Sequence, residues 1–484
     1  MNIIAIFEFV SNILLAEAVF MLPAVGVSIY FGETLSVKAF LVTILLLIFL
    51  SLILRFKGKG EKMIYAKEGF AIVFLSWILI SLFGSIPFYI SGSITRFIDC
   101  FFESVSGFTT TGASIIYDVE VLPKGILYWR AFIQWLGGMG VLVFILAILP
   151  SSKNTEGSLH VFQSESPGPA VGKLVPSIRT NAAILYKIYI FLTVLEIIFL
   201  LAGGMPFFDS ITNAFATAGT GGYCIKNASI AAYDSTYLRL VITVFMILFG
   251  INFNMFYFII IGHFKRVYKN EELRAYLGII LVSTVLIAIN IHTMFDSIFD
   301  SLQYSLFQVA SIITTTGFVT SNFDLWPEFS KMIMFGLMIM GASASSTGGG
   351  VKVARVIILA KAAKNGIQKY QHPNSVRVIK MDGKIIDDQV IHGVFVFMFV
   401  YVIIAFISFL LISSNNFDFQ TTVASVLTCI SNLGSGFGIV SPVGNFYNFS
   451  FMSKLVLCVD MFIGRLEIFP MLMIFMPSYW KRGR

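Results

Sequence analysis

Long apolar runs that carry almost no charge constrain this chain more than any other feature of its sequence. Of its 484 residues, 57% are hydrophobic and only 12% are charged, whereas a soluble domain usually carries about 25% charged residues. Several runs come near the roughly 20 residues that a helix needs to cross the hydrocarbon core of a membrane. They are Ala39–Leu54, Phe70–Leu82, Val141–Pro150, Tyr186–Ala202 and Val394–Ile412. The sequence therefore predicts an all-α polytopic protein embedded in the lipid bilayer.

Basic residues gather in five segments between the apolar runs, and these segments hold most of the 33 lysines and arginines. The segments are Arg55–Lys67, Lys153–Lys187, Lys265–Arg274, Lys352–Lys384 and Lys481–Arg484. By the positive-inside rule they face the cytoplasm, so the net charge of +7 indicates topology and no nucleic-acid partner. Both termini are then predicted to be cytoplasmic. The first apolar stretch, Ile3–Tyr30, lacks a basic start and contains Glu8 and Glu17, so we expect a retained helix and no cleaved signal peptide.

Residues that carry out catalysis in other proteins are scattered in this sequence. The four cysteines lack metal-binding spacing, and the five histidines form no i, i+4 pair and no H-E-x-x-H motif. A Ser/His, paired-Asp or metal constellation at membrane depth is not visible. We therefore expect neither an enzyme nor an organic cofactor in this chain.

Four segments repeat one pattern: a long apolar helix, a shorter semi-polar helix, a loop rich in small residues, and another long helix. The loops read TTTGA at Thr109–Ala113, TGGY at Thr220–Tyr223, TTTGF at Thr314–Phe318 and SNLGS at Ser431–Ser435. In the first two repeats, Asp99 and Asp209 precede Gly112 and Gly222 by the same number of residues. The chain therefore contains a fourfold internal repeat.

Short helices followed by such loops are typical of a membrane pore. Irregular backbone at membrane depth is tolerated only where it is buried in protein or lines a water-filled cavity. Four loops can converge on one axis, where their carbonyl oxygens replace the hydration shell of a monovalent cation. For any single loop the alternative is close helix packing by small residues, but four loops in equivalent positions favour the pore.

Five stretches resemble the Trk/Ktr/HKT superfamily of cation transporters, and most closely its bacterial Trk-type membrane subunit. They are WRAFIQWLGGMG (Trp129–Gly140), ESPGP (Glu165–Pro169), FQVASIITTTGF (Phe307–Phe318), CISNLGSGFG (Cys429–Gly438) and GRLEIFP (Gly464–Pro470). The resemblance implies four M1–P–M2 pore-loop repeats in pseudo-fourfold symmetry after an N-terminal extra helix pair, with about ten transmembrane helices. The predicted divisions are residues 1–60 for the extra pair, 61–150 for repeat 1, 151–262 for a cytoplasmic loop and repeat 2, 263–387 for repeat 3 with an intramembrane gate loop and a cytoplasmic segment, and 388–484 for repeat 4.

The resemblance assigns a selectivity filter to four glycines and the two residues before each. These are Thr110, Thr111 and Gly112; Thr220, Gly221 and Gly222; Thr315, Thr316 and Gly317; and Asn432, Leu433 and Gly434. It implies that K⁺, the transported ion, is held at each glycine and at the residue before it. A serine at the first glycine accompanies sodium-permeable plant members, so four glycines favour potassium. The second and fourth loops depart from TTTG, which predicts a less stringent filter that also passes rubidium.

A run of small residues interrupts the apolar helix expected at Met332–Lys364. The run consists of Gly341, Ala342, Ser343, Ala344, Ser345, Ser346, Thr347, Gly348, Gly349 and Gly350. A stable helix is not expected through three consecutive glycines, because each costs about 1 kcal/mol relative to Ala. The resemblance places this run directly below the filter. We hypothesise that it is a gate that a cytoplasmic partner moves aside; a passive kink that lets helices pack is the alternative.

Arg465 lies inside the last apolar helix, where a charge is costly and indicates a functional role. The resemblance places it beside the pore near the filter. There it opposes cation dwelling or holds the gate run by donating to backbone carbonyls. A buried ion pair with Asp460 or Glu467 is the alternative.

Polar residues in two other apolar helices have simpler interpretations. Arg130 is predicted to lie at the outer membrane interface, with its side chain reaching the lipid headgroups. Asn252 and Asn254 are weaker candidates for a transport role, and Asn252 is expected to cap or cross-link helices.

These features predict passive, channel-like potassium uptake across a bacterial cytoplasmic (inner) membrane. The alternative is an ion-coupled secondary transporter that moves K⁺ with H⁺ or Na⁺, although that class predicts two symmetric interrupted helices. The resemblance implies a homodimer of this chain and a ring of cytoplasmic regulatory subunits that bind nucleotides. The basic segments Lys153–Lys187 and Lys352–Lys384 are the candidate docking surfaces.

Overall fold

The computed structural model describes residues 3–57, 66–140, 178–372 and 378–466, together with 468, 471 and 472. Across these residues helices are joined by loops, and the strands form one antiparallel hairpin of β1 (Lys380–Met381) and β2 (Lys384–Ile385). The predicted all-α membrane fold is thus confirmed. The run Val141–Pro150 and the motif Glu165–Pro169 lie outside the described residues, as does most of Lys153–Lys187.

Six helices within the described part of the chain are long and apolar enough to cross a membrane. They lie in α1 (Ile3–Tyr30), α2 (Thr34–Lys57), α3 (Ala66–Gly84) continued by α4 (Ile86–Ile90), α9 (Ile178–Ala202), α14 (Glu271–Ile291) and α18 (Asp388–Ser413). The pair α11 (Thr236–Phe249) and α12 (Phe253–Ile260) forms a seventh candidate span, bent by 93°. The total of about ten spans and the domain boundaries stay predictions.

Four short helices stand between longer ones and end at the Thr/Gly loops. They are α5 (Phe97–Phe108), α10 (Phe207–Gly219), α15 (Ile298–Ile313) and α19 (Phe419–Ile430). Ser297 caps the start of α15, where its hydroxyl accepts the Phe299 N–H, and Asp418 caps the start of α19, where its carboxylate accepts the Thr421 N–H. After the loops follow α6 (Lys124–Gly138), α11, α16 (Glu328–Ile339) and α20 (Phe451–Leu466).

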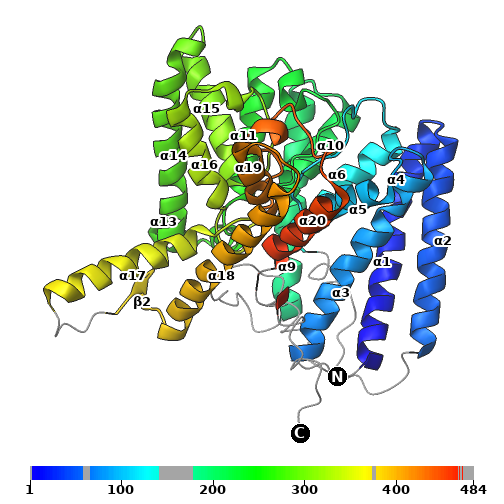
Figure 1. Cartoon of the computed structure of the whole chain (residues 1–484), viewed down its shortest axis with the longest axis horizontal. Helices are drawn as coiled ribbons and strands as arrows, with labels where there is room; N and C mark the ends of the chain where they lie inside the picture. Colours follow the sequence, from blue (N-terminus) through cyan, green and yellow to red (C-terminus); the bar gives the residue numbers. More distant parts are fainter. Residues whose placement is uncertain are drawn as a thin grey trace.

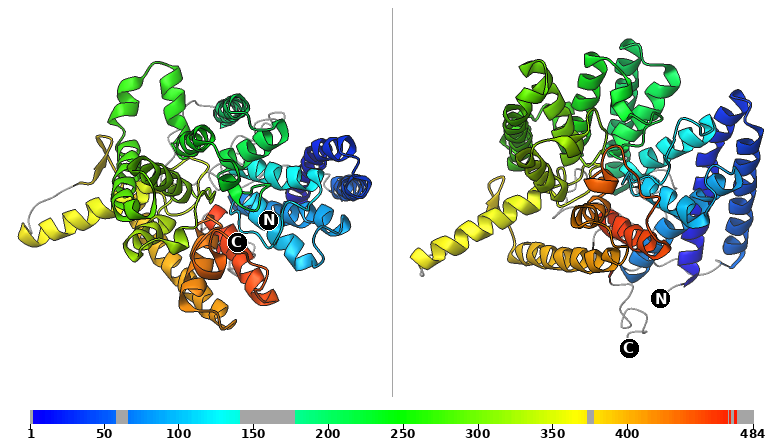
Figure 2. Two further views of the ribbon diagram at one scale, coloured as in Figure 1. Left: turned by 90° about the horizontal axis from the view of Figure 1, so that it is seen from above. Right: turned by 45° about the horizontal axis from the view of Figure 1, so that its top comes forward.

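The four helix–loop–helix units follow one another around a common centre in sequence order (Figure 2). Helices α1 and α2 lie outside this circle and pack on α3 and α6. A hydroxyl pair, Ser11 with Ser51 at 2.9 Å, joins α1 to α2. The Glu33 carboxylate then accepts the backbone N–H groups of Lys124 and Gly125 at the start of α6, which fixes the extra pair to the first unit.

The third unit contains a break in its last helix. Helix α16 ends at Ile339 and α17 (Val353–Gln371) begins beyond the glycine run, while Met340 and Val351 form a parallel bridge across its base. Helix α17 projects from the body together with the hairpin (Figure 1). The remaining short helices are η1 (Ser229–Ala232), α13 (Phe264–Lys269), η2 (His292–Met294), η3 (Phe323–Leu325) and η4 (Gly438–Val440).

Candidate functional site

The four loops share one backbone conformation although their side chains differ. Thr110, Thr220, Thr315 and Asn432 all have positive φ values of 56°, 53°, 58° and 54°. The glycines that follow two residues later have φ values of 78°, 71°, 80° and 82°. A β-branched threonine in this region is strained, and such strain persists only where the surroundings fix the backbone.

One hydrogen-bond pattern fixes each loop to the helix before it. The residue preceding each glycine donates its N–H to a carbonyl in the last turn of its own short helix. The pairs are Thr111 to Ser106, Gly221 to Ala216, Thr316 to Ser311 and Leu433 to Thr428, at 2.8, 2.9, 2.8 and 2.8 Å. The second and fourth loops, which depart from TTTG, therefore keep the same backbone bonds as the first and third.

The four glycines meet in a closed ring. A Cβ atom added to any of them would lie less than 3.0 Å from a carbonyl oxygen of the next loop. The pairs are Gly112 with Gly221 O, Gly222 with Thr316 O, Gly317 with Leu433 O, and Gly434 with Thr111 O. Each loop thus packs its glycine on the neighbouring loop, and the fourth packs on the first. Only glycine provides this approach at positive φ.

A cavity of about 150 Å³ opens on one side of the ring. All four glycines line it, and so do Tyr117, Lys226 and Asn227. The Asn227 amide donates to Asp118 at 2.8 Å and its N–H to Glu120 at 3.2 Å. These bonds lower the pKa of both carboxyls below their ordinary values. The cavity rim is therefore cross-linked between the first and second units.

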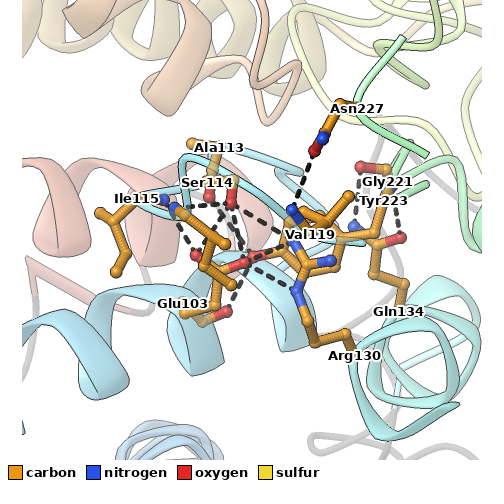
Figure 3. Close-up of polar contacts among 11 residues, drawn as sticks. Glu103, Ala113, Ser114, Ile115, Val119, Arg130, Gln134, Gly221, Tyr223 and Asn227 are labelled. Carbon is orange, nitrogen blue, oxygen red and sulfur yellow. Dashed lines mark hydrogen bonds and ion pairs between the residues drawn. The ribbon is translucent and has the colours of Figure 1, made fainter. Parts of the chain in front are cut away.

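Arg130 lies behind the ring, and its predicted position at the lipid interface is wrong. The guanidinium is buried and donates to the Glu103 carboxylate of α5, at 2.9 Å from Nε and 2.6 Å from Nη2. It also stacks on the Tyr223 ring, 4.1 Å from the ring centroid. The same carboxylate accepts from the Ser114 hydroxyl at 3.0 Å and from the Ile115 N–H at 3.0 Å (Figure 3). An ion pair between α5 and α6 thus supports the first loop.

Two side-chain amides also bind the loops, and sequence reasoning assigned neither of these contacts. Gln134 of α6 donates to the Gly221 carbonyl at 2.7 Å and accepts the Tyr223 N–H at 3.0 Å (Figure 3). Asn432 donates to the Thr111 hydroxyl at 2.9 Å, so its side chain joins the fourth loop to the first. A polar residue inside an apolar helix was the only sequence signal for Gln134.

The run Gly341–Gly350 lies against the other side of the ring from the cavity. The Gly349 N–H donates to the Thr315 hydroxyl at 2.7 Å. A Cβ on Gly348 would lie 2.9 Å from the Thr314 carbonyl oxygen, and a Cβ on Gly349 would overlap the Ser431 carbonyl. The run therefore contacts the third and fourth loops, where their helices end.

Neighbouring helices hold this run from outside. The Ser343 N–H donates to the Gly250 carbonyl at 3.1 Å, and the Ala344 N–H donates to the Glu272 carboxylate of α14 at 2.6 Å. Gly250 and Glu272 lie at the two ends of the α12–α13 segment. Asn252 caps α12 by accepting the Asn254 N–H at 3.0 Å, as predicted.

Two buried cations donate to three consecutive carbonyls of the run. Arg465 donates from Nη1 to the Thr347 carbonyl at 2.8 Å. The Lys352 ammonium donates to the Gly348 carbonyl and, at 3.2 Å, to the Gly349 carbonyl. Sequence reasoning identified Arg465 but missed Lys352, because a lysine next to a glycine run resembles the basic residues of a cytoplasmic segment.

Arg465 also joins the run to the first unit. Its Nη2 donates to the carbonyls of Gly137 and Gly138 at the end of α6, the latter at 2.6 Å. Asp460, one alternative partner, accepts from the Ser408 hydroxyl at 2.8 Å. Glu467, the other, lies outside the described residues.

Comparison with known proteins extends over nearly the whole chain. Residues 36–482 match the model of the TrkH family, described as a cation transport protein. The "Trk system potassium uptake protein TrkH" of Salmonella typhimurium is 35% identical over 430 residues, 88% of each chain. The protein of the same name from Vibrio parahaemolyticus is 33% identical over 489 residues, 99% of each chain. The crystal structure of the potassium transporter TrkH from Vibrio parahaemolyticus superposes with a TM-score of 0.88 and 31% identity, covering 99% of this chain and 100% of that one.

Proposed function

Because this chain belongs to the TrkH family of cation transport proteins, we propose that it takes up potassium ions through the ring of its four loops. The observation that carries the proposal is the cyclic packing of Gly112, Gly222, Gly317 and Gly434 on the next loop. Loops that meet in this way bring four carbonyl-bearing segments around one centre. Carbonyl oxygens arranged around a centre can replace the water around a desolvated monovalent cation.

The ion in this proposal is K⁺, held at the glycines and at Thr111, Gly221, Thr316 and Leu433. The curated relatives are named potassium uptake proteins, which supports this choice. Backbone bonds at these positions are alike in the four loops. Permeation is passive, and the membrane potential supplies about 2.3 kcal/mol per charge for each 100 mV.

The run Gly341–Gly350 is the gate in this proposal. It lies against the third and fourth loops, on the side of the ring opposite the cavity. Its carbonyls at Thr347, Gly348 and Gly349 are held by Arg465 and Lys352. Opening requires that the hydrogen bonds from Arg465 and Lys352 to the run break. Because α17 follows the run directly in the chain, a pull on α17 moves the run.

Regulation in this proposal comes from outside the chain. The protein works as a homodimer in a bacterial inner membrane, with both termini in the cytoplasm and a ring of nucleotide-binding subunits below it. Helix α17 supports this idea because it projects from the body (Figure 1) and exposes Ile367 and Tyr370 beside basic residues. A partner bound there is connected to the gate run through one continuous helix.

Purified protein in liposomes tests the proposed function. We expect uptake of ⁸⁶Rb⁺ into KCl-loaded vesicles without any proton or sodium gradient, and inhibition by external K⁺ at lower concentrations than by Na⁺. Uptake that appears only with a sodium or proton gradient would replace the channel with the coupled transporter. Empty vesicles and vesicles containing Gly112→Ala protein serve as controls.

A further inference from the structure

The buried ion pair of Glu103 and Arg130 is by itself weak evidence for a contribution to stability. Both side chains are buried, with 0% and 2% of their surface exposed. Replacing such a pair by apolar side chains is often neutral or stabilising, because desolvation of two charges offsets their attraction. Its hydrogen bonds therefore point to what the pair does.

Those bonds attach the first loop just beyond its glycine. The Glu103 carboxylate accepts the Ile115 N–H and the Ser114 hydroxyl, and Arg130 donates to the same hydroxyl at 3.3 Å. The chain that leaves Gly112 is thus fixed to both α5 and α6. Figure 3 shows Ser114, Ile115 and Arg130 converging on the one carboxylate.

The second loop is attached to the same two residues, Glu103 and Arg130, through Tyr223. The Tyr223 hydroxyl donates to the Glu103 carbonyl at 2.9 Å and to the Ala113 carbonyl at 3.3 Å, while its ring lies under the Arg130 guanidinium. Tyr223 directly follows Gly222. Glu103 and Arg130 therefore support the chain just after the glycine in both the first and the second loop. We call Glu103, Arg130, Ser114 and Tyr223 the filter brace.

The third and fourth loops are built differently. The position of Glu103, counted back from the glycine, is occupied by Asn213, Gln308 and Ser425 in the other units. Neither side-chain polar atom of the buried Gln308 has a hydrogen-bond partner within the described residues. The position of Ser114 in the third unit is Val319, and that loop is held by a neutral bond, from the Ser311 hydroxyl to the Phe318 carbonyl at 2.7 Å. The ionic brace therefore supports one half of the ring.

We propose that the filter brace sets the discrimination between K⁺ and the smaller Na⁺, with Glu103 and Arg130 acting as positioning residues. This inference rests on the proposed function of the ring. A sodium ion is accommodated when the carbonyl oxygens draw inward around it, so selectivity needs a support that resists this contraction. The brace supports the first loop through charge-assisted hydrogen bonds, which are shorter and stronger than neutral ones. It supports the second loop through the Tyr223 hydroxyl and through the Tyr223 ring under Arg130. The remaining two loops are those that the gate run contacts.

Glu103→Gln is the direct test. The glutamine keeps the size of the side chain and an acceptor for Ile115, but it removes the ion pair with Arg130. The measurement is the ratio of ²²Na⁺ to ⁸⁶Rb⁺ uptake into liposomes containing the full-length protein. This ratio does not depend on how much protein is folded, so a lowered yield does not change it. We expect the ratio to rise about tenfold, the effect of losing one charge-assisted hydrogen bond.

Gln308→Met is the matched control, because it changes the equivalent buried position of the third unit at similar volume. We expect its ratio to equal that of the unchanged protein. Ser114→Ala and Tyr223→Phe each remove one hydroxyl with its hydrogen bonds and leave the ion pair intact, so they decide the matter if Glu103→Gln does not fold. Each should raise the ratio in the same direction, by about threefold.

An unchanged ratio in folded Glu103→Gln protein, or in both smaller variants, overturns the inference. So does an equal rise in Gln308→Met, since the cause would then be the polarity of the short helices in general. The proposed function fails separately, when the unchanged protein shows no ⁸⁶Rb⁺ uptake at all.

Discussion

The N–H of Gly349 donates to the hydroxyl of Thr315 at 2.7 Å, so the interrupted helix of the third unit is bonded directly to the third loop. Thr315 is also the non-glycine residue of that loop with positive φ. Movement of the Gly341–Gly350 run therefore removes a hydrogen bond from a strained residue in the ring. In the proposed mechanism, gate and filter are therefore in direct contact at Thr315.

Shortening the run should open the pore. Deleting Ser343–Ser346 removes the bonds to Gly250 and Glu272 and leaves the base at Met340 and Val351 in place. We expect ⁸⁶Rb⁺ uptake by the deletion protein in liposomes to rise about tenfold, which equals about 1.4 kcal/mol of closed-state stabilisation. Unchanged uptake together with unchanged regulation would mean that the run is a passive kink.

Arg465→Ala should raise potassium flux. The arginine donates to Thr347 of the run and to Gly137 and Gly138 of α6, so its loss frees the run from the first unit. Hydrogen bonds to charged groups contribute about 1.5–3 kcal/mol each, which predicts at least a tenfold increase in single-channel open probability. Arg465→Lys, which lacks the guanidinium fork, should be intermediate. A variant that only expresses poorly, with normal channel behaviour per molecule, would indicate a structural role.

Lys352→Met should also raise the flux, and its effect should not add to that of Arg465→Ala. Lys352 holds Gly348 and Gly349, and Arg465 holds the neighbouring Thr347. Residues that act on one small element show coupling energies of about 0.5–3 kcal/mol in double-mutant cycles. Open probabilities of the two single variants and the double variant measure this coupling. Strict additivity would show that the two cations act on separate elements.

Gly112→Ala should abolish uptake, whereas Gly204→Ala should not. Both glycines have positive φ, 78° and 83°, so both substitutions carry similar backbone strain, about 1 kcal/mol. A Cβ on Gly112 overlaps the Gly221 carbonyl, but a Cβ on Gly204 meets nothing within 4 Å. Rates of ⁸⁶Rb⁺ uptake per folded protein separate the two. Retained uptake in Gly112→Ala would show that ions do not pass through this ring.

Local signals were enough to predict the helices, the loops and the break. The apolar runs, the spacing of Gly112 and Gly222 after their short helices, and the glycines at Gly348–Gly350 act through the backbone over a few residues. The positive φ of Thr110 and Thr315 was not predictable in this way. It is imposed by the ring, since threonine by itself disfavours that region.

Contacts between distant side chains were not predictable. Arg130 is predicted to be interfacial because it lies near the start of an apolar helix. Its partner Glu103 belongs to another helix, and the sequence does not show which face of that helix points toward Arg130. Glu272 was missed for the same reason, since it accepts the N–H of Ala344, 72 residues away in the run. In an apolar chain, the partner of a buried charge depends on the assembled fold.

The contact of Gly434 with the Thr111 carbonyl has a consequence for biosynthesis. The contact between the first and fourth units also includes the Asn432–Thr111 hydrogen bond and a buried ion pair of Lys454 with Asp99 at 2.6 Å. The residues on the two sides of this contact are far apart in the sequence, with 321 positions between Thr111 and Asn432, so the ribosome synthesises them at different times. The nascent chain therefore carries an incomplete circle of polar groups through the membrane until its last helices are inserted. In the proposed mechanism, conduction therefore begins only when the fourth loop has joined the first and closed the ring.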